Sequence, residues 1–212
     1  SVNDSGLVLF SSGSSGKPKA MVHNLDTLID SFKSKRVKSL NFLVFLMFDH
    51  IGGINTLLNS LAMGVAITLP KNRDPEYICK LIEQYKVNVL PTSPTFLNLI
   101  LLSGANTKYD LSSLKLITYG TEPMPESLLV KINKSFPRAK LLQTYGTSET
   151  GIAQISSKSS TSNLIKFNDP NYKYRIVDNE LWLRSKTQVN GYLNADNVKF
   201  TDDGWFKTGD MV

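Results

Sequence analysis

Residues 87–104, VNVLPTSPTFLNLILLSG, contain the change of pattern that decides the fold of this chain. The apolar run at 87–90 has the length of a buried strand, and residues 95–102 continue as an apolar helix that Gly104 stops. A further apolar run at 114–118 predicts the next strand. A strand, a helix and a second strand in this order form the repeating unit of parallel sheets, so this stretch indicates an α/β fold.

The same alternation extends outward over the first two thirds of the 212 residues. Asn24 is a suitable N-cap for an amphipathic helix, and Asp74 with Pro75 marks the start of another helix. We expect a mostly parallel sheet flanked by helices, with ligands at the carboxyl ends of its strands. The other predicted strands are 7–10, which we expect to be buried, 40–48, 65–69 and 139–144, and the other predicted helices are 25–32, 51–63, 75–86 and 126–136.

The pattern changes near residue 155. Residues 156–163 are polar and rich in serine, which predicts a loop or linker. Two strands at 172–177 and 180–184, joined by Asp178-Asn179, form a hairpin signal. We therefore expect two units, an α/β subdomain over 1–155 and a small β subdomain over 164–212.

The composition is that of an ordinary globular protein, with 41% hydrophobic residues, 20% charged residues and a net charge of +6. Only residues 33–38 group lysines tightly, so we expect no nucleic-acid partner. The single cysteine, Cys79, excludes an internal disulfide and a thiolate metal cluster. The sequence has no apolar run long enough for a membrane span and no signal-peptide pattern, so we expect a cytoplasmic protein.

The loop after the first predicted strand combines three features that a triphosphate requires. Glycines let backbone N–H groups approach closely, serine hydroxyls donate hydrogen bonds, and lysine supplies positive charge. The loop is not a Walker loop, because the Gly-Lys-Ser/Thr ending is absent. A flexible Ser/Gly linker is the alternative interpretation. The candidate phosphate-binding residues are Ser11, Ser12, Gly13, Ser14, Ser15, Gly16 and Lys19.

A second polar segment, Tyr145-Gly146-Thr147-Ser148-Glu149, follows the strand predicted at 139–144. An aromatic face can stack on a purine, a hydroxyl can hold an α-phosphate, and a carboxylate can bind Mg²⁺. A simple turn is the alternative interpretation of a lone Tyr-Gly pair, so the assignment depends on the motifs that accompany it.

In this order, these segments resemble the adenylate-forming superfamily, which includes acyl-CoA synthetases, firefly luciferase and the adenylation domains of peptide synthetases. The loop is similar to Thr-Ser-Gly-Thr-Thr-Gly-x-Pro-Lys-Gly, with serine for each threonine and Ala20 for the last glycine. Residues 145–149 are similar to Tyr-Gly-x-Thr-Glu, again with serine for threonine. Residues 191–194 and 204–210 match two more signatures, so the resemblance covers residues 7 to 210.

The resemblance implies a role for each candidate residue. The Ser/Gly loop and Lys19 hold the β- and γ-phosphates, Ser148 holds the α-phosphate, and Glu149 binds Mg²⁺. The remaining positions contact the nucleoside. Gly120, Thr121 and Glu122 lie against adenine, at the turn where the family has Gly-Gly-Ala-Pro. Tyr145 and Gly146 lie beside the purine, and Asp210 accepts hydrogen bonds from the ribose hydroxyls.

Residues 48–53 are similar to the segment where the family places an aromatic and a histidine beside the acyl pocket. If His50 takes the histidine position, the substrate is a simple carboxylic acid. If Asp49 takes it, the substrate is an amino acid, whose ammonium group a carboxylate attracts. Gly52-Gly53 favours His50, to which we assign a catalytic role; a helix-entry residue without a ligand is the alternative.

The resemblance implies ATP-dependent activation of a carboxylic acid, fatty or other, as acyl-AMP. The cofactors implied are ATP and Mg²⁺, with coenzyme A or the phosphopantetheine of an acyl carrier protein as acceptor. Family members carry a further N-terminal subdomain and a C-terminal domain whose lysine serves adenylation, so we expect a truncated core with little activity alone. An amino-acid adenylation fragment and a non-catalytic nucleotide-binding remnant are the alternatives.

Overall fold

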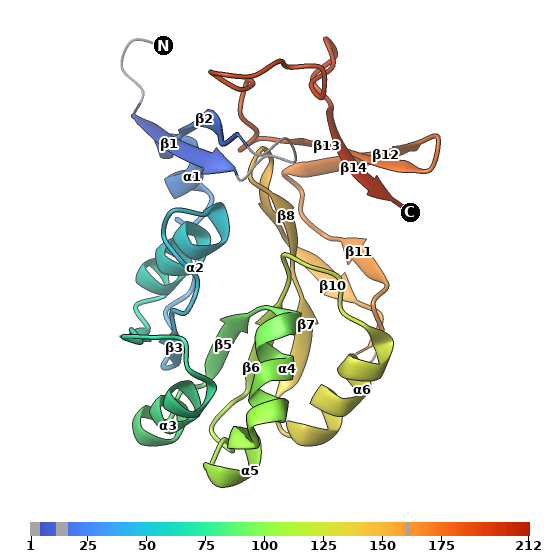
Figure 1. Ribbon diagram of the computed structural model, residues 1–212. Coiled ribbons are helices and arrows are strands. Elements are labelled where there is room, and N and C mark those ends of the chain that lie inside the picture. Colours follow the sequence, from blue (N-terminus) through green and yellow to red (C-terminus); the bar gives the residue numbers. More distant parts are fainter. Residues whose placement is uncertain (1–4, 12–16, 160–161) are drawn as a thin grey trace.

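The computed structural model describes residues 5–11, 17–159 and 162–212 (Figure 1). Its largest sheet has five strands in the order β4-β3-β5-β6-β7, and every neighbouring pair is parallel. The predicted α/β fold with a mostly parallel sheet is therefore confirmed. The strands are β3 (Asn41–Leu43), β4 (Ala66–Thr68), β5 (Val89–Thr92), β6 (Leu116–Tyr119) and β7 (Lys140–Gln143).

Helices cover both faces of this sheet. Four of them, α3 (Pro75–Tyr85), α4 (Pro94–Ser103), α5 (Ala105–Lys108) and α6 (Glu126–Ser135), form one contiguous layer. Helix α2 (Ile51–Ala62) connects β3 to β4, and this connection runs along the sheet in the direction opposite to the connections through α3, α4 and α6. Because such connections are right-handed, α2 lies on the other face of the sheet, where it contacts β9. No helix of the described ranges has the length and apolar character to traverse a bilayer.

Local sequence signals explain where these helices begin. The Asp74 side chain accepts a hydrogen bond from the Tyr77 N–H at 2.9 Å, and Ser93 caps α4 in the same way through the Phe96 N–H. Proline follows each cap, where its missing N–H costs nothing. The faces of the helices and strands that point inward form the core. Burial of each aliphatic side chain there contributes about 1.5–3 kcal/mol to the stability of the fold. The fully buried members of this core include Ile78, Ile82, Leu90, Leu97, Ile100, Ile117, Leu129 and Ile132.

The strand predicted at 7–10 is confirmed, but the prediction that it is a buried strand is wrong for one of its faces. Among the described strands, β1 (Gly6–Ser11) pairs only with β2 (Lys19–Asn24), in a separate antiparallel sheet that precedes α1 (Leu25–Asp30). One face of the hairpin packs on a second, smaller core, whereas Val8 and Phe10 on the other face are more than half exposed. A two-stranded ribbon has one protected face, so its apolar residues alternate between buried and exposed.

The last third of the described chain consists of short antiparallel sheets. The predicted hairpin is confirmed: β12 (Tyr172–Val177) pairs with β13 (Glu180–Ser185) through Asp178-Asn179, and β14 (Phe206–Met211) completes the sheet. The loop predicted at 156–163 is wrong at its start, because β10 (Ile155–Ser157) pairs with β11 (Ile165–Phe167). Strands β8 (Tyr145–Thr147) and β9 (Gly151–Ala153) form another hairpin. The boundary between subdomains 1–155 and 164–212 stays a prediction.

Strand β3 ends at Leu43 and not at residue 48 as predicted. After Phe45 the chain turns back onto the start of α2, where the Met47 carbonyl oxygen lies close to the backbone of Gly53. A Cβ at Gly53 would lie 1.8 Å from that oxygen, whereas a Cβ at Gly52 would meet only the Leu46 side chain at 3.6 Å. The turn that carries Asp49 and His50 therefore requires glycine at position 53.

We expect Gly53→Ala to lower the free energy of unfolding by about 1–3 kcal/mol, the range for overpacking, because the Met47 turn and α2 must separate. Gly52→Ala is the matched control in the same helical turn. It should be neutral or stabilising by up to about 1 kcal/mol, because alanine favours helix. Urea unfolding of both variants measures the difference, and equal stabilities would contradict the close approach at Gly53.

Candidate functional site

A cavity of about 840 Å³ lies where β6 and β7 end and the sheet β12-β13-β14 begins to cover them. Its volume is within the usual range for ligand sites. The cavity brings together three segments that are far apart in the sequence, at 120–123, 143–149 and 206–212. The predicted site residues in its lining are Gly120, Thr121, Glu122, Tyr145, Gly146, Glu149 and Asp210.

The turn after β6 is shaped by a close backbone approach. A Cβ at Gly120 would lie 2.3 Å from the Thr144 hydroxyl oxygen, so only glycine allows β6 and β7 to end side by side. Thr121 adopts φ 71°, an unusual conformation for a threonine. The backbone of this turn is thereby presented to the cavity.

Glu122 has a structural role that the sequence did not indicate. Its carboxylate accepts hydrogen bonds from the Thr95 N–H at 2.8 Å and the Thr95 hydroxyl at 2.7 Å, at the N-terminus of α4. Burial acts to raise the pKa of Glu122, but the bonds from Thr95 outweigh burial and lower the pKa below its ordinary value. Glu122 therefore holds the 120–123 turn against α4.

Aromatic side chains form one wall of the cavity. The Tyr145 ring packs edge-on against Phe167, with centroids 5.7 Å apart, and Phe167 stacks on Tyr174 at 5.3 Å. The Tyr145 hydroxyl donates a hydrogen bond to the Asp210 carboxylate. Burial and this bond raise the pKa of Tyr145, so the phenol keeps its proton.

Phe167, Tyr174 and Lys199 line the same cavity, and sequence reasoning missed all three. Tyr174 belongs to a strand that was predicted from its pattern, which is a signal for structure but not for a site, and Phe167 belongs to β11, which was not predicted. Lys199 lies in an irregular segment between two motifs, where nothing distinguished it from other lysines.

Glu149 lies at the base of the cavity with a relative exposure of 9%. The Tyr192 hydroxyl donates a hydrogen bond to Glu149 Oε1 at 2.6 Å. Burial and this bond raise the pKa of Tyr192, so the phenol stays a donor. His23 is fully buried nearby, and burial lowers its pKa, which favours the uncharged imidazole. Glu149 thus faces a neutral donor and not a fixed cation.

Four predicted site residues, Ser11, Lys19, His50 and Ser148, lie outside the lining of this cavity as far as the described residues show. Lys19 is the first residue of β2. Ser148 is in the turn between β8 and β9, partly buried. His50 is the N-cap residue of α2 with an exposed side chain, and its Nε2 lies 3.7 Å from Asp49 Oδ1. Ser11 shares a surface groove with Asp49 and His50. The predicted loop residues Ser12, Gly13, Ser14, Ser15 and Gly16 lie outside the described residues.

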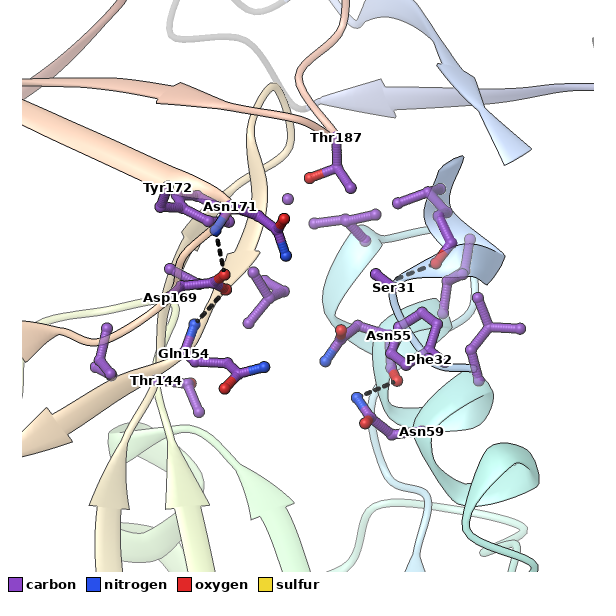
Figure 2. A pocket seen from close by; sticks show the side chains of 18 of the residues that line it. Ser31, Phe32, Asn55, Asn59, Thr144, Gln154, Asp169, Asn171, Tyr172 and Thr187 are labelled. Atoms are coloured by element: carbon purple, nitrogen blue, oxygen red, sulfur yellow. Dashed lines mark hydrogen bonds between the residues drawn. The ribbon is translucent and has the colours of Figure 1, made fainter. Parts of the chain in front are cut away.

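A second cavity of about 430 Å³ adjoins the first (Figure 2). The side chains of Asn55, in α2, and Phe32, just after α1, line this cavity on one side. Thr144, just after β7, and Gln154, just after β9, line it on the opposite side. Gln143 and Thr144 line both cavities, so the two share a wall at the end of β7. Residues 48–53 were predicted to lie beside the acyl pocket, and Ile51 of that segment, with Ile54 directly after it, lines this cavity.

Comparison with known proteins identifies the family. The sequence matches the AMP-binding enzymes over residues 2–193, and the chain belongs to that family. It is 30% identical to acyl-CoA synthetase 7 of Caenorhabditis elegans and 26% identical to 4-coumarate–CoA ligase-like 9 of Arabidopsis thaliana, over 99% of this chain in both cases. The chain spans 44% and 42% of the lengths of these two relatives.

Solved structures agree with this assignment. The luciferase-like enzyme from the mealworm Zophobas morio matches with a TM-score of 0.80 and 26% identity, over 100% of this chain and 55% of that chain. An anthranilate CoA ligase in complex with anthranoyl-AMP matches with a TM-score of 0.82 over 96% of this chain and 44% of that chain. At 19% identity this second likeness shows the fold alone. The resemblance to the adenylate-forming superfamily is confirmed.

We expect Glu122→Gln to lower the free energy of unfolding at pH 7 by about 0.5 kcal/mol, the low end for a helix cap, because the carboxylate is exposed. The folded-state pKa lies below the ordinary value of 4.5, so the stabilisation is complete above pH 4.5 and is lost as the pH falls through the lowered pKa. Chemical denaturation across pH should show the two proteins converging in acid. A constant difference down to the lowest pH would contradict the charge-assisted cap.

Proposed function

We propose that this chain is the ATP-binding part of an enzyme that activates a carboxylic acid as acyl-AMP. The observation that carries the proposal is the convergence of seven predicted site residues, from three separated segments, on one cavity of about 840 Å³. Membership of the AMP-binding family supports the same conclusion.

The adenosine part of ATP would occupy this cavity. The Tyr145 face would contact the purine, because an aromatic ring and a base offer each other flat apolar surfaces. The Gly120 turn would present its backbone to the other edge of the base. Asp210 would accept hydrogen bonds from the ribose hydroxyls, and its bond from Tyr145 would fix the carboxylate. Lys19 and the Ser/Gly loop would hold the outer phosphates.

Glu149 would hold Mg²⁺ together with the phosphates. The described residues contain no group of three His, Cys, Asp or Glu side chains that could form a metal cage. Mg²⁺ fits such a site, because it is commonly bound by one or two carboxylates plus substrate phosphates. When bound, the ion would neutralise charge on the phosphates. Glu149 would orient it from the base of the cavity.

The carboxylic acid would occupy the second cavity (Figure 2). The shared wall at Gln143 and Thr144 would bring the acid next to the α-phosphate of ATP. His50, at the start of the helix that lines this cavity, would act near the junction, in the groove it shares with Ser11. The acid would be a fatty or other acyl acid, and the names of the relatives, acyl-CoA synthetase and 4-coumarate–CoA ligase, support an acyl or aryl substrate.

In the whole protein, a carboxylate oxygen would attack the α-phosphorus and pyrophosphate would leave. The acyl group would then pass from AMP to the thiol of coenzyme A. The chain's own contribution is to hold two anionic substrates in reacting geometry and to offset their charge. Ser148 would donate a hydrogen bond to the α-phosphate. No protein nucleophile is required.

We expect the wild-type chain to bind AMP, and to bind a non-hydrolysable acyl-adenylate analogue more tightly, because the analogue reaches both cavities. Asp210→Ala should weaken both ligands by about 10- to 100-fold, the loss expected for hydrogen bonds to a charged group. Isothermal titration calorimetry measures the dissociation constants.

Asp202→Ala is the matched control, because Asp202 is an exposed acid eight positions earlier and lies outside the lining of the cavity. It should bind both ligands as the wild type does. Equal weakening by the two substitutions would indicate a general charge effect. No weakening by Asp210→Ala would show that the ribose assignment is wrong.

A further inference from the structure

Residues 191–194 have no role in the proposed function, yet they join the strand after the Ser/Gly loop to the rest of the site. Tyr192 forms a β-bridge with Met21, and the Leu193 N–H donates to the Ala20 carbonyl at 2.9 Å. The Asn194 side chain accepts a bond from the Ala20 N–H at 2.8 Å and donates to the Pro18 carbonyl at 3.0 Å. These bonds fix the backbone on both sides of Lys19.

Tyr192 itself contacts both charged residues of the proposed phosphate and metal sites. The Lys19 ammonium lies 4.8 Å from the centroid of the Tyr192 ring, a cation–π distance. The hydroxyl at the other end of the ring donates to Glu149 Oε1 at 2.6 Å. With a relative exposure of 7%, the Tyr192 side chain is fixed by packing against Leu9, Met21 and Phe200.

The backbone beneath Tyr192 is also held in place. Gly191 adopts φ 147°, and a Cβ there would lie 2.6 Å from Asn197 Oδ1. The same oxygen accepts the Tyr192 N–H at 2.7 Å. Only glycine permits this approach, so the local sequence places the phenol with little freedom. The Glu149 carbonyl accepts the Val189 N–H at 2.9 Å, which ties the acidic turn to the same segment.

We propose that Tyr192 is a positioning residue that orients the Glu149 carboxylate toward the divalent cation and Lys19 toward the phosphates. This inference rests on the proposed function. A buried carboxylate loses water on one side, and the phenol replaces it with a single directed hydrogen bond at Oε1. The other carboxylate oxygen is then left for the ion. Hydrogen-bond partners of metal ligands act in this way, and their loss costs about 10- to 100-fold in metal affinity.

The two ends of the side chain can be tested separately. Tyr192→Phe keeps the ring beside Lys19 and deletes only the hydroxyl that Glu149 accepts. Tyr192→Leu removes the ring as well. Tyr109→Phe is the matched control, because its ring also lies near a lysine, Lys108, at 5.6 Å, and Tyr109 follows α5 outside the lining of both cavities. Glu149→Gln reports on the metal assignment itself.

The experiment titrates Mg²⁺ into the full chain at fixed ATP and, separately, titrates AMP and ATP without metal, all by calorimetry. We expect Tyr192→Phe to raise the Mg²⁺ concentration for half-maximal ATP binding by about tenfold or more and to leave metal-free AMP affinity unchanged. Tyr192→Leu should in addition weaken metal-free ATP, because Lys19 loses its support. Tyr109→Phe should match the wild type in every titration. Far-ultraviolet circular dichroism and urea unfolding confirm that each variant is folded.

A wild-type Mg²⁺ response in Tyr192→Phe, together with a lost response in Glu149→Gln, would overturn the role of Tyr192 and leave the proposed function standing. A wild-type response in Glu149→Gln would overturn the metal assignment and this inference with it. Absence of nucleotide binding by the folded wild-type chain would contradict the proposed function. An equal loss of metal-free AMP binding in Tyr192→Phe would show that the phenol is merely structural.

Discussion

The hydrogen bond from Tyr192 to Glu149 connects three parts of the structure that are far apart in the sequence. Glu149 follows the parallel sheet, Tyr192 lies in an irregular segment near the C-terminal strands, and the β-bridge to Met21 adds the N-terminal hairpin. Without this junction, the hairpin that carries Lys19 would be held mainly by its smaller core. This buried polar contact, together with the hydrogen bonds that Leu193 and Asn194 make to the hairpin, therefore fixes the candidate phosphate residue Lys19 relative to the candidate metal residue Glu149.

Close backbone approaches provide the second constraint on the site. Gly120 lets the end of β6 meet Thr144, and Gly146 lies so close to Gly151 that a Cβ would be 2.4 Å from its carbonyl oxygen. The first contact places the ends of β6 and β7 side by side at the carboxyl edge of the sheet, and the second closes the β8–β9 hairpin that follows β7. The ends of the parallel strands β6 and β7 thus form one side of the nucleotide cavity, and the antiparallel strands β12, β13 and β14 form the opposite side.

Much of the parallel sheet and its helices could be predicted, because helix caps and apolar spacing are features of short stretches of sequence. Asp74 with Pro75 and the apolar spacing around Ile100 specify helices whatever lies around them. The elements that were missed depend on distant partners. Strand β2 exists through its pairing with β1, and β10 through its pairing with β11 across a polar segment. Two of the three residues of β10 are serines, and β2 directly precedes the helix that Asn24 caps, so only the tertiary contacts reveal these strands.

The site was predictable to the extent that its chemistry lies in short motifs. Tyr145, Glu149 and Asp210 were found as motif members, and the structure brings them to one cavity. The cap formed by Glu122 and the phenol of Tyr192 could not be found in this way. Each acts through a hydrogen bond to a residue 27 or 43 positions away, and the sequence has no local signal for such a pair.

The central claim is that one nucleotide site forms between the parallel sheet and the β12-β13-β14 sheet, next to a separate acid cavity. The most direct test is a crystal structure of the chain with a non-hydrolysable acyl-adenylate analogue. We predict the purine beside Tyr145, the ribose on Asp210, and the acyl group beyond Thr144 in the cavity lined by Asn55 and Gln154. Adenosine bound elsewhere, or an acyl group that points away from Thr144, would contradict this account.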